Sequence, residues 1–222
     1  MESKRLAGEK AVDFVEEGMV LGLGTGSTVY FTLVRLAERV KQGLNIKGVP
    51  TSIETERIAR HLGIPLVNSG EAGKIDVAID GADAIDSHFT LIKGGGGALL
   101  REKMIALAAD RFIVVADPGK FVTDLTHVNL PVEIIPFARE LTEIHVKGLG
   151  CTTRLRMKDN KPFITDNGNF ILDCSFSEII EPNDLQMKLN RIPGVVENGL
   201  FAGLADQIIT VDHSGKAAVL ET

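Results

Sequence analysis

The sequence predicts an α/β protein with a mainly parallel sheet and a smaller α+β module inserted before its last strands. In the first half of the chain, short β-branched runs alternate with helical patterns, as in a parallel sheet that is covered by helices. Near residue 128 this alternation with Gly-rich turns gives way to a separate, self-contained series of elements. Two apolar runs at the end of the chain predict strands that return to the first domain.

Composition excludes several classes of protein. The chain has 222 residues, 44% of them apolar, and a net charge of −6, so it can bury a core and is not disordered. The acidic balance disfavours a nucleic-acid binder, and no window reaches the roughly 18 apolar residues of a membrane span. Cys151 and Cys174 are too few and too far apart for a disulfide framework, so we expect reduced thiols and a cytoplasmic protein.

Helical and strand patterns place the elements of the first half. Amphipathic spacing predicts helices at residues 7–15, 28–41, 51–62 and 98–110, and glycines lie beyond the ends of the first three. The third of these helices begins at a capping box formed by Thr51 and Glu54. Apolar runs predict buried strands at residues 19–23, 46–49, 64–67, 75–79, 89–92 and 112–115.

The second half reads as β-α-β-β-α-β, an order that suggests a ferredoxin-like module. A strand at 153–157 should point Arg154 and Arg156 outward and Leu155 and Met157 inward. Asn167-Gly168 supplies a turn. The other expected elements are strands at 132–135, 163–164, 170–172 and 195–201, a helix at 137–146, and a helix capped by Asn183 and Gln186 and ended by Pro193-Gly194.

Strands at 207–211 and 217–220 should rejoin the first sheet. We therefore predict a first domain formed by residues 1–127 plus 206–222. Residues 128–205 form the inserted domain.

The first loop whose residues could bind a ligand is Gly22-Leu23-Gly24-Thr25-Gly26-Ser27-Thr28, between a strand and a helix. Glycines bring backbone N–H groups close to a ligand, and a helix N-terminus favours an anion. The dinucleotide pattern is incomplete because Ser27 replaces its last glycine, and no lysine follows as in a Walker A loop. Hydroxyl groups here fit a terminal phosphate better. A tight turn without a ligand is the alternative.

The second loop is Asp80-Gly81-Ala82-Asp83, directly after an apolar strand. Two carboxylates at this spacing could bind sugar hydroxyls, share a proton or hold a divalent ion. A solvated acidic turn is the alternative. The local sequence shows too few ligands for a metal site.

The third loop is Lys93-Gly94-Gly95-Gly96-Gly97, which opens a strongly helical segment. Such a loop offers backbone donors to a developing oxyanion, whereas a flexible linker would serve nothing inside a domain. Glu102 lies about one turn into the helix and leans back towards the loop, although a surface Glu-Lys pattern is the alternative. Lys93 could neutralise negative charge on a substrate.

The fourth loop, Asp117-Pro118-Gly119-Lys120, also follows a strand. In open α/β sheets, ligands bind outside the carboxyl ends of the strands, and all four loops lie at such ends. Lys120 is therefore a second candidate cation for a phosphate, with a solvated turn lysine as the alternative.

Together these motifs resemble the A-type ribose-5-phosphate isomerase family. The resemblance covers nearly the whole chain in order. It rests on the segments Gly24-Thr25-Gly26-Ser27-Thr28, Asp80-Gly81-Ala82-Asp83, Lys93-Gly94-Gly95-Gly96-Gly97, Arg101-Glu102-Lys103, Asp117 with Lys120, and later Ile192-Pro193-Gly194-Val195-Val196.

The resemblance implies a Rossmann-like catalytic domain with an inserted ferredoxin-like domain. It also implies interconversion of ribose 5-phosphate and ribulose 5-phosphate in the pentose phosphate pathway, without a metal or nucleotide cofactor, by a homodimer or homotetramer. By similarity, Glu102 is the base, and Asp80, Asp83 and Lys93 are the other catalytic residues. The implied substrate-binding residues are Lys4, Thr25, Gly26, Ser27, Thr28, Gly94, Gly95, Gly96 and Lys120.

One position departs from the family pattern, since Ala84 stands where the family usually has Glu. This departure bears on the electrostatics of the acidic loop more than on the reaction. Two other functions remain open. One is a phosphosugar sensor, which needs the phosphate loop but not Glu102, and the other is a coenzyme A transferase that uses a Glu nucleophile.

Overall fold

The computed structural model describes residues 1–126 and 128–222, and its contacts divide the chain into two compact units. The first unit comprises residues 1–82, 101–120 and 203–222, and the second comprises residues 83–100 and 121–202. This division differs from the predicted one, which keeps residues 83–100 in the first domain. The predicted boundary residue, 127, lies outside the described residues.

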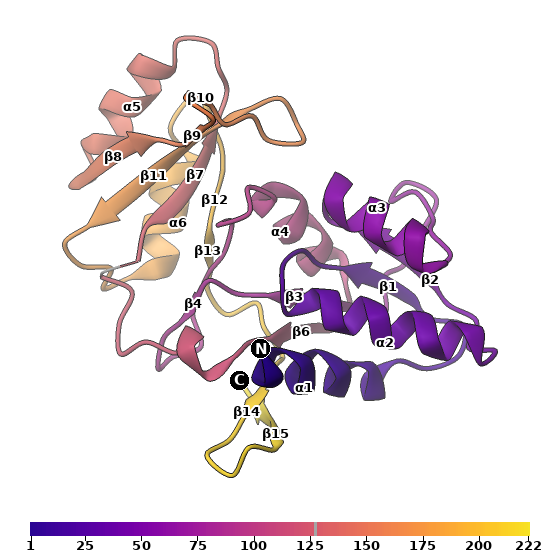
Figure 1. Cartoon of the computed structure of the whole chain (residues 1–222). Coiled ribbons are helices and arrows are strands. Elements are labelled where there is room, and N and C mark those ends of the chain that lie inside the picture. The colour runs from indigo at the N-terminus through magenta and orange to yellow at the C-terminus, as the bar shows by residue number, and fades with distance from the viewer. Residues whose placement is uncertain (127) are drawn as a thin grey trace. The chain divides into compact units, whose positions relative to one another are not determined.

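The first unit contains a six-stranded sheet in the order β15-β14-β6-β3-β1-β2 (Figure 1). Its pairs are parallel except for β14 and β15, which form an antiparallel hairpin at one edge. Its elements are α1 (Glu2–Ala11), the 3-10 helix η1 (Val12–Phe14), β1 (Val20–Leu23), α2 (Val29–Lys41), β2 (Lys47–Pro50), α3 (Ile53–Leu62), β3 (Val77–Gly81), β6 (Phe112–Val115), the 3-10 helix η2 (Pro118–Lys120), β14 (Gln207–Val211) and β15 (Ala217–Glu221). Helix α4 (Leu99–Ala108) begins in the second unit and continues in the first.

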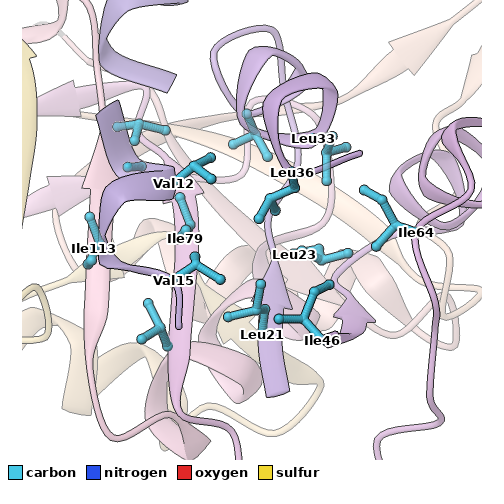
Figure 2. Packing of buried hydrophobic residues seen from close by; sticks show 14 of the residues in the cluster. Val12, Val15, Leu21, Leu23, Leu33, Leu36, Ile46, Ile64, Ile79 and Ile113 are labelled. Carbon is cyan, nitrogen blue, oxygen red and sulfur yellow. The ribbon is translucent and has the colours of Figure 1, made fainter. Parts of the chain in front are cut away.

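Helices cover both faces of this sheet. Figure 2 shows Leu33 and Leu36 of α2 near Leu23 of β1, in a core that these fully buried side chains share. Gly22 points to the opposite face, because side chains alternate along a strand. A Cβ on Gly22 would lie 2.4 Å from Ile105 of α4, so the glycine lets that helix pack directly on β1. The mainly parallel α/β class is therefore confirmed.

The second unit contains a four-stranded antiparallel sheet in the order β12-β7-β11-β8. This order, with one helix after β7 and one after β11, matches the predicted ferredoxin-like module. Its elements are β4 (Ala84–Ile85), β5 (Leu91–Ile92), β7 (Leu130–Ile134), α5 (Arg139–Lys147), β8 (Cys151–Leu155), β9 (Met157–Lys158), β10 (Lys161–Pro162), β11 (Phe170–Phe176), α6 (Pro182–Asn190), β12 (Val195–Asn198) and β13 (Leu200–Phe201).

A three-stranded sheet in the order β13-β5-β4 explains why residues 83–100 belong to the second unit. Its outer strand β13 directly follows β12 in the chain. Ala84 is 1% exposed and packs in the core of this unit, together with Ile92 and Leu200. The departure from the family pattern at position 84 therefore places a small apolar side chain in a core.

Several local predictions are wrong. The N-cap of α3 is Ser52, whose hydroxyl accepts from the N–H of Thr55, and not Thr51. The run 64–67 forms only an isolated bridge between Leu66 and Gly48. Helix α6 has Glu181 as its N-cap, without a side-chain hydrogen bond, so Asn183 lies inside the helix.

Two predicted strands are interrupted. The run 195–201 is divided at Gly199, where a Cβ would lie 2.3 Å from the carbonyl oxygen of Lys93, and its two parts join different sheets. The alternation predicted for 153–157 holds for the exposed Arg154 but ends there. Met157 is 53% exposed, whereas the side chain of Arg156 is only 15% exposed.

No helix in the described part of the chain is both long enough and apolar enough to cross a membrane.

Candidate active site

The loop after β1 is built around the carboxylate of Asp80, which is 2% exposed at the end of β3. Its Oδ1 accepts hydrogen bonds from the N–H of Thr25 at 3.0 Å and from the N–H of Gly81 at 2.7 Å. A Cβ on Gly24 would lie 2.3 Å from the same oxygen, so only glycine admits this approach. Asp80 thus fixes the direction of the loop that the sequence predicts to hold a phosphate.

The hydroxyl group of Thr25 joins a cluster of hydroxyl side chains at the start of α3. Its Oγ1 lies 2.9 Å from Oγ1 of Thr51, 2.8 Å from Oγ of Ser52 and 3.0 Å from Oγ1 of Thr55. Thr55 in turn donates to the carbonyl oxygen of Gly24 at 2.8 Å. The cluster anchors the loop on its buried side, while Gly26 and Ser27 remain exposed.

The side chain of Lys4 contacts the exposed part of this loop. Lys4 of α1 donates from Nζ to Oγ of Ser27 at 3.0 Å and lies 4.0 Å from Oδ2 of Asp117. Thr28 is buried and forms the N-cap of α2. Lys120 is half-buried and ends η2, three residues after Asp117. The first unit thus presents two lysines, exposed N–H groups and a helix N-terminus near one loop system, an arrangement suited to an anion.

Glu102 lies in the first turn of α4 and is 6% exposed. A surface role, the alternative to the catalytic interpretation, is excluded by this burial. The helix that carries Glu102 is fixed on β1 by the contact of Ile105 with Gly22. Burial is one of the ways in which enzymes adjust a carboxylate for proton transfer.

In the second unit, Asp83 supports the glycine-rich loop. Its Oδ2 accepts from the N–H of Gly95 at 2.6 Å, while its own N–H donates to the carbonyl oxygen of Ile92. Lys93 is 2% exposed, and its Nζ lies 5.5 Å from the centre of the Phe201 ring. The loop therefore begins at a buried lysine and continues through two exposed residues, Gly95 and Gly96.

Positive φ angles explain the glycines at both ends of this loop. Gly94 has a φ of +99° and Gly97 a φ of +86°, a backbone region that strains other residues. A Cβ on Gly97 would also lie 2.5 Å from the ring of Phe163. The loop is consequently a rigid turn, held by a hydrogen bond from Gly97 N–H to the Gly94 carbonyl oxygen, and is not a linker.

Arginine supports this loop in a way that the sequence did not suggest. Nη1 of Arg156 donates to the carbonyl oxygens of Gly94 at 2.8 Å and Gly95 at 3.1 Å, and the guanidinium forms an ion pair with Asp173. No local pattern marks this role, because Asp173 lies 17 positions away and Gly94 and Gly95 lie 62 and 61 positions away.

A buried glutamate holds the turn that follows β10. Oε1 of Glu133, which is fully buried, accepts from Thr165 Oγ1 at 2.9 Å, Asn167 Nδ2 at 3.1 Å and Asn169 Nδ2 at 2.9 Å. The turn at Asn167-Gly168 is confirmed. The only sequence signal for such an acceptor is the presence of three side-chain donors, Thr165, Asn167 and Asn169, within five residues.

The predicted site residues are thus divided between the units. Lys4 meets Ser27 and Asp80 meets Thr25 in the first unit, which also carries Glu102 and Lys120, whereas Asp83 meets Gly95 in the second. In the described residues, no three His, Cys, Asp or Glu side chains are grouped to hold a metal ion. Cys151 and Cys174 are both free and buried.

Comparison with known proteins shows what this chain is similar to. The family model described as ribose 5-phosphate isomerase A (phosphoriboisomerase A) matches residues 47–215. A ribose-5-phosphate isomerase A from Bacillus mycoides is 51% identical over 97% of this chain and 98% of its own length. One from Methanoregula boonei is 48% identical over 98% of this chain and 93% of its own.

Solved structures agree with these relatives. A D-ribose-5-phosphate isomerase in complex with phospho-erythronic acid is 42% identical, with a TM-score of 0.94 over 99% of this chain and 97% of its own. A ribose 5-phosphate isomerase from Plasmodium falciparum is 37% identical, with a TM-score of 0.95 over 100% of this chain and 99% of its own. The chain belongs to the ribose 5-phosphate isomerase A family.

Proposed function

We propose that this protein is an aldose-ketose isomerase that interconverts D-ribose 5-phosphate and D-ribulose 5-phosphate, a reaction of the pentose phosphate pathway. The observation that carries the proposal is the 51% identity, over almost the full length of both chains, to a relative named for this reaction. The structure supports it with a buried carboxylate at Glu102 and loops rich in anion-binding groups.

The phosphate of the substrate binds at the loop after β1. Lys4 and Lys120 supply positive charge, and Gly26, Ser27 and Thr28 supply N–H and hydroxyl donors at the start of α2. Thr25 supports the phosphate loop from within, because its N–H donates to Asp80 and its hydroxyl donates to Ser52. Lys4 already donates to Ser27, so a phosphate oxygen would compete for an ammonium group that is in place. Helix N-termini with free backbone donors favour such anions.

Proton transfer is the task of Glu102. In the open-chain aldose, its carboxylate removes the proton from C2, and the electron pair moves to form an enediolate. The same proton then returns to C1, while a proton passes from the C2 oxygen to the C1 oxygen, so the ketose is formed without gain or loss of atoms. Lys93 and the N–H groups of Gly94 and Gly96 stabilise the negative charge of the enediolate, while the N–H of Gly95 stays bonded to Asp83 and holds the loop.

Asp80 and Asp83 contribute in two ways. Each holds a loop N–H in place, at Thr25 and Gly95 respectively. Each also offers an acceptor for sugar hydroxyls and for opening of the ring. The family assignment favours this isomerase over the phosphosugar sensor and the coenzyme A transferase.

The experiment is incubation of the purified protein with ribose 5-phosphate in deuterated water, followed by NMR spectroscopy. We expect ribulose 5-phosphate to form and deuterium to enter at C1 when the transferred proton exchanges on Glu102. Binding of ribose 5-phosphate without any conversion would reject the proposal and favour the sensor.

The finer expectations about assembly and location belong to the same proposal. The protein acts as a homodimer or homotetramer in the cytoplasm, where its two free cysteines stay reduced. Light scattering on the purified protein gives the mass that tests the oligomer.

A further inference from the structure

Arg156 lies between the end of β8 and the start of β9 in the second unit. Its N–H donates to the carbonyl oxygen of Ile171 at 2.8 Å, and its carbonyl oxygen accepts from the N–H of Phe163 at 2.9 Å. The backbone is therefore fixed on both sides. Its side chain is 15% exposed, although the strand pattern predicts that it points into solvent.

Asp173 of β11 orients the guanidinium. Nε donates to Oδ2 at 3.1 Å and Nη2 donates to Oδ1, so the carboxylate engages one edge of the arginine fork. Asp173 itself is 11% exposed, which protects the pair from solvent screening. The geometry leaves Nη1 directed at the glycine loop, where it reaches the carbonyl oxygens of Gly94 and Gly95.

These two contacts determine where the loop N–H groups point. Peptide bonds are planar and the described chain has no cis peptide, so each N–H points away from the carbonyl oxygen of the same peptide. With the Gly94 carbonyl turned to Arg156, the Gly95 N–H faces the opposite way, where it meets Asp83. With the Gly95 carbonyl turned to Arg156, the Gly96 N–H must also face away from the arginine.

We propose that Arg156, held by Asp173, is a positioning residue that orients the Gly95–Gly96 peptide so that the N–H of Gly96 serves as a donor to the enediolate, while the N–H of Gly95 stays bonded to Asp83. This inference rests on the proposed role of the glycine loop in the isomerase. Arg156 does not touch the substrate in this account. It acts through the loop. In the Gly94–Gly95 peptide, Arg156 holds the carbonyl oxygen and Asp83 holds the N–H.

Only arginine meets this requirement. One edge of the guanidinium binds the carboxylate of Asp173, and Nη1 binds the carbonyl oxygens of Gly94 and Gly95. A planar guanidinium with five N–H donors can make all of these contacts at once. A lysine carries the same charge but lacks the fixed fork. Without the guanidinium, the Gly95–Gly96 peptide can rotate and direct its N–H away from the reacting atoms.

The test compares Arg156→Ala and Arg156→Lys with the matched control Arg154→Ala, an exposed arginine two residues earlier on β8. We expect kcat of R156A to fall by up to about 100-fold, the loss that a misplacement of about 1 Å can cause in an active site. KM should change much less, and the pH dependence of kcat should not change. R154A should match the wild type, and R156K should fall between R154A and R156A.

Chemical rescue separates positioning from a merely structural role. Added guanidinium ion, below the concentration that unfolds the protein, should restore part of the kcat of R156A and none in R154A. Thermal unfolding of each variant shows the folded fraction. The inference is overturned if R156A retains the kcat of R154A, or if its loss matches its unfolded fraction and guanidinium restores nothing.

Gly95→Ala distinguishes failure of this inference from failure of the proposed loop function. Its methyl group would lie 2.7 Å from Oδ1 of Asp83 and displace the loop directly. If G95A keeps full kcat, the loop has no part in the reaction and the proposed function of the loop fails. If G95A loses kcat while R156A behaves like R154A, only the positioning role of Arg156 fails.

Discussion

Replacing Gly24 by alanine would push a methyl group into the carboxylate that organises the loop after β1. The new Cβ would lie 2.3 Å from Oδ1 and 2.5 Å from Cα of Asp80, so backbone as well as side chain would have to move. Overpacking of this kind costs about 1–3 kcal/mol. Losing one of the two N–H hydrogen bonds to Oδ1 costs about 1.5–3 kcal/mol more.

The expected loss is therefore about 3 kcal/mol or more, which corresponds to a fall in melting temperature of roughly 6–12 °C for a chain of this size. Gly70→Ala is the matched control, because a Cβ there meets nothing within 4 Å. Thermal unfolding followed by circular dichroism measures both variants, and the KM for ribose 5-phosphate reports on the loop. A G24A protein as stable as G70A, with an unchanged KM, would refute the packing argument.

Two further predictions concern the second unit. Glu133→Ala removes the acceptor of three hydrogen bonds from the turn at 165–169, so urea denaturation should show a loss of about 3 kcal/mol or more, and a loss below about 1 kcal/mol would contradict it. Hydrogen bonds from the Lys147 ammonium, which has the larger effect, and from the Thr153 hydroxyl lower the pKa of Glu143 below its unfolded value of about 4.3. A carboxylate with a lowered pKa stabilises the folded state above that pH. The difference in the free energy of unfolding between wild type and Glu143→Gln should thus have its largest value above pH about 5 and shrink as the pH falls through the lowered pKa. A difference that does not depend on pH would exclude this linkage.

Much of the fold is predictable because its signals are local. The strand β6 has the predicted bounds, since four consecutive buried residues between polar turns have few other interpretations. The loops at the carboxyl ends of β1, β3 and β6 follow from the same alternation. The burial of Glu102 agrees with its predicted place one turn into α4.

The errors arise where distant contacts override local pattern. Ser52 and Thr51 are both residue types that form N-caps, but Thr51 donates its hydroxyl to the carbonyl oxygen of Leu23 instead. Arg156 breaks an alternating strand because its ion pair with Asp173, 17 residues away, draws the side chain inward. Neither contact leaves a trace in the neighbouring sequence.

The role of Glu102 as the proton carrier is tested most directly by the turnover of Glu102→Gln. The amide keeps the size of the buried side chain but cannot accept the C2 proton, so kcat should fall by at least about 100-fold. Binding of ribose 5-phosphate, measured by calorimetry under the same conditions, should persist. An E102Q protein that turns over at the wild-type rate would contradict the assignment.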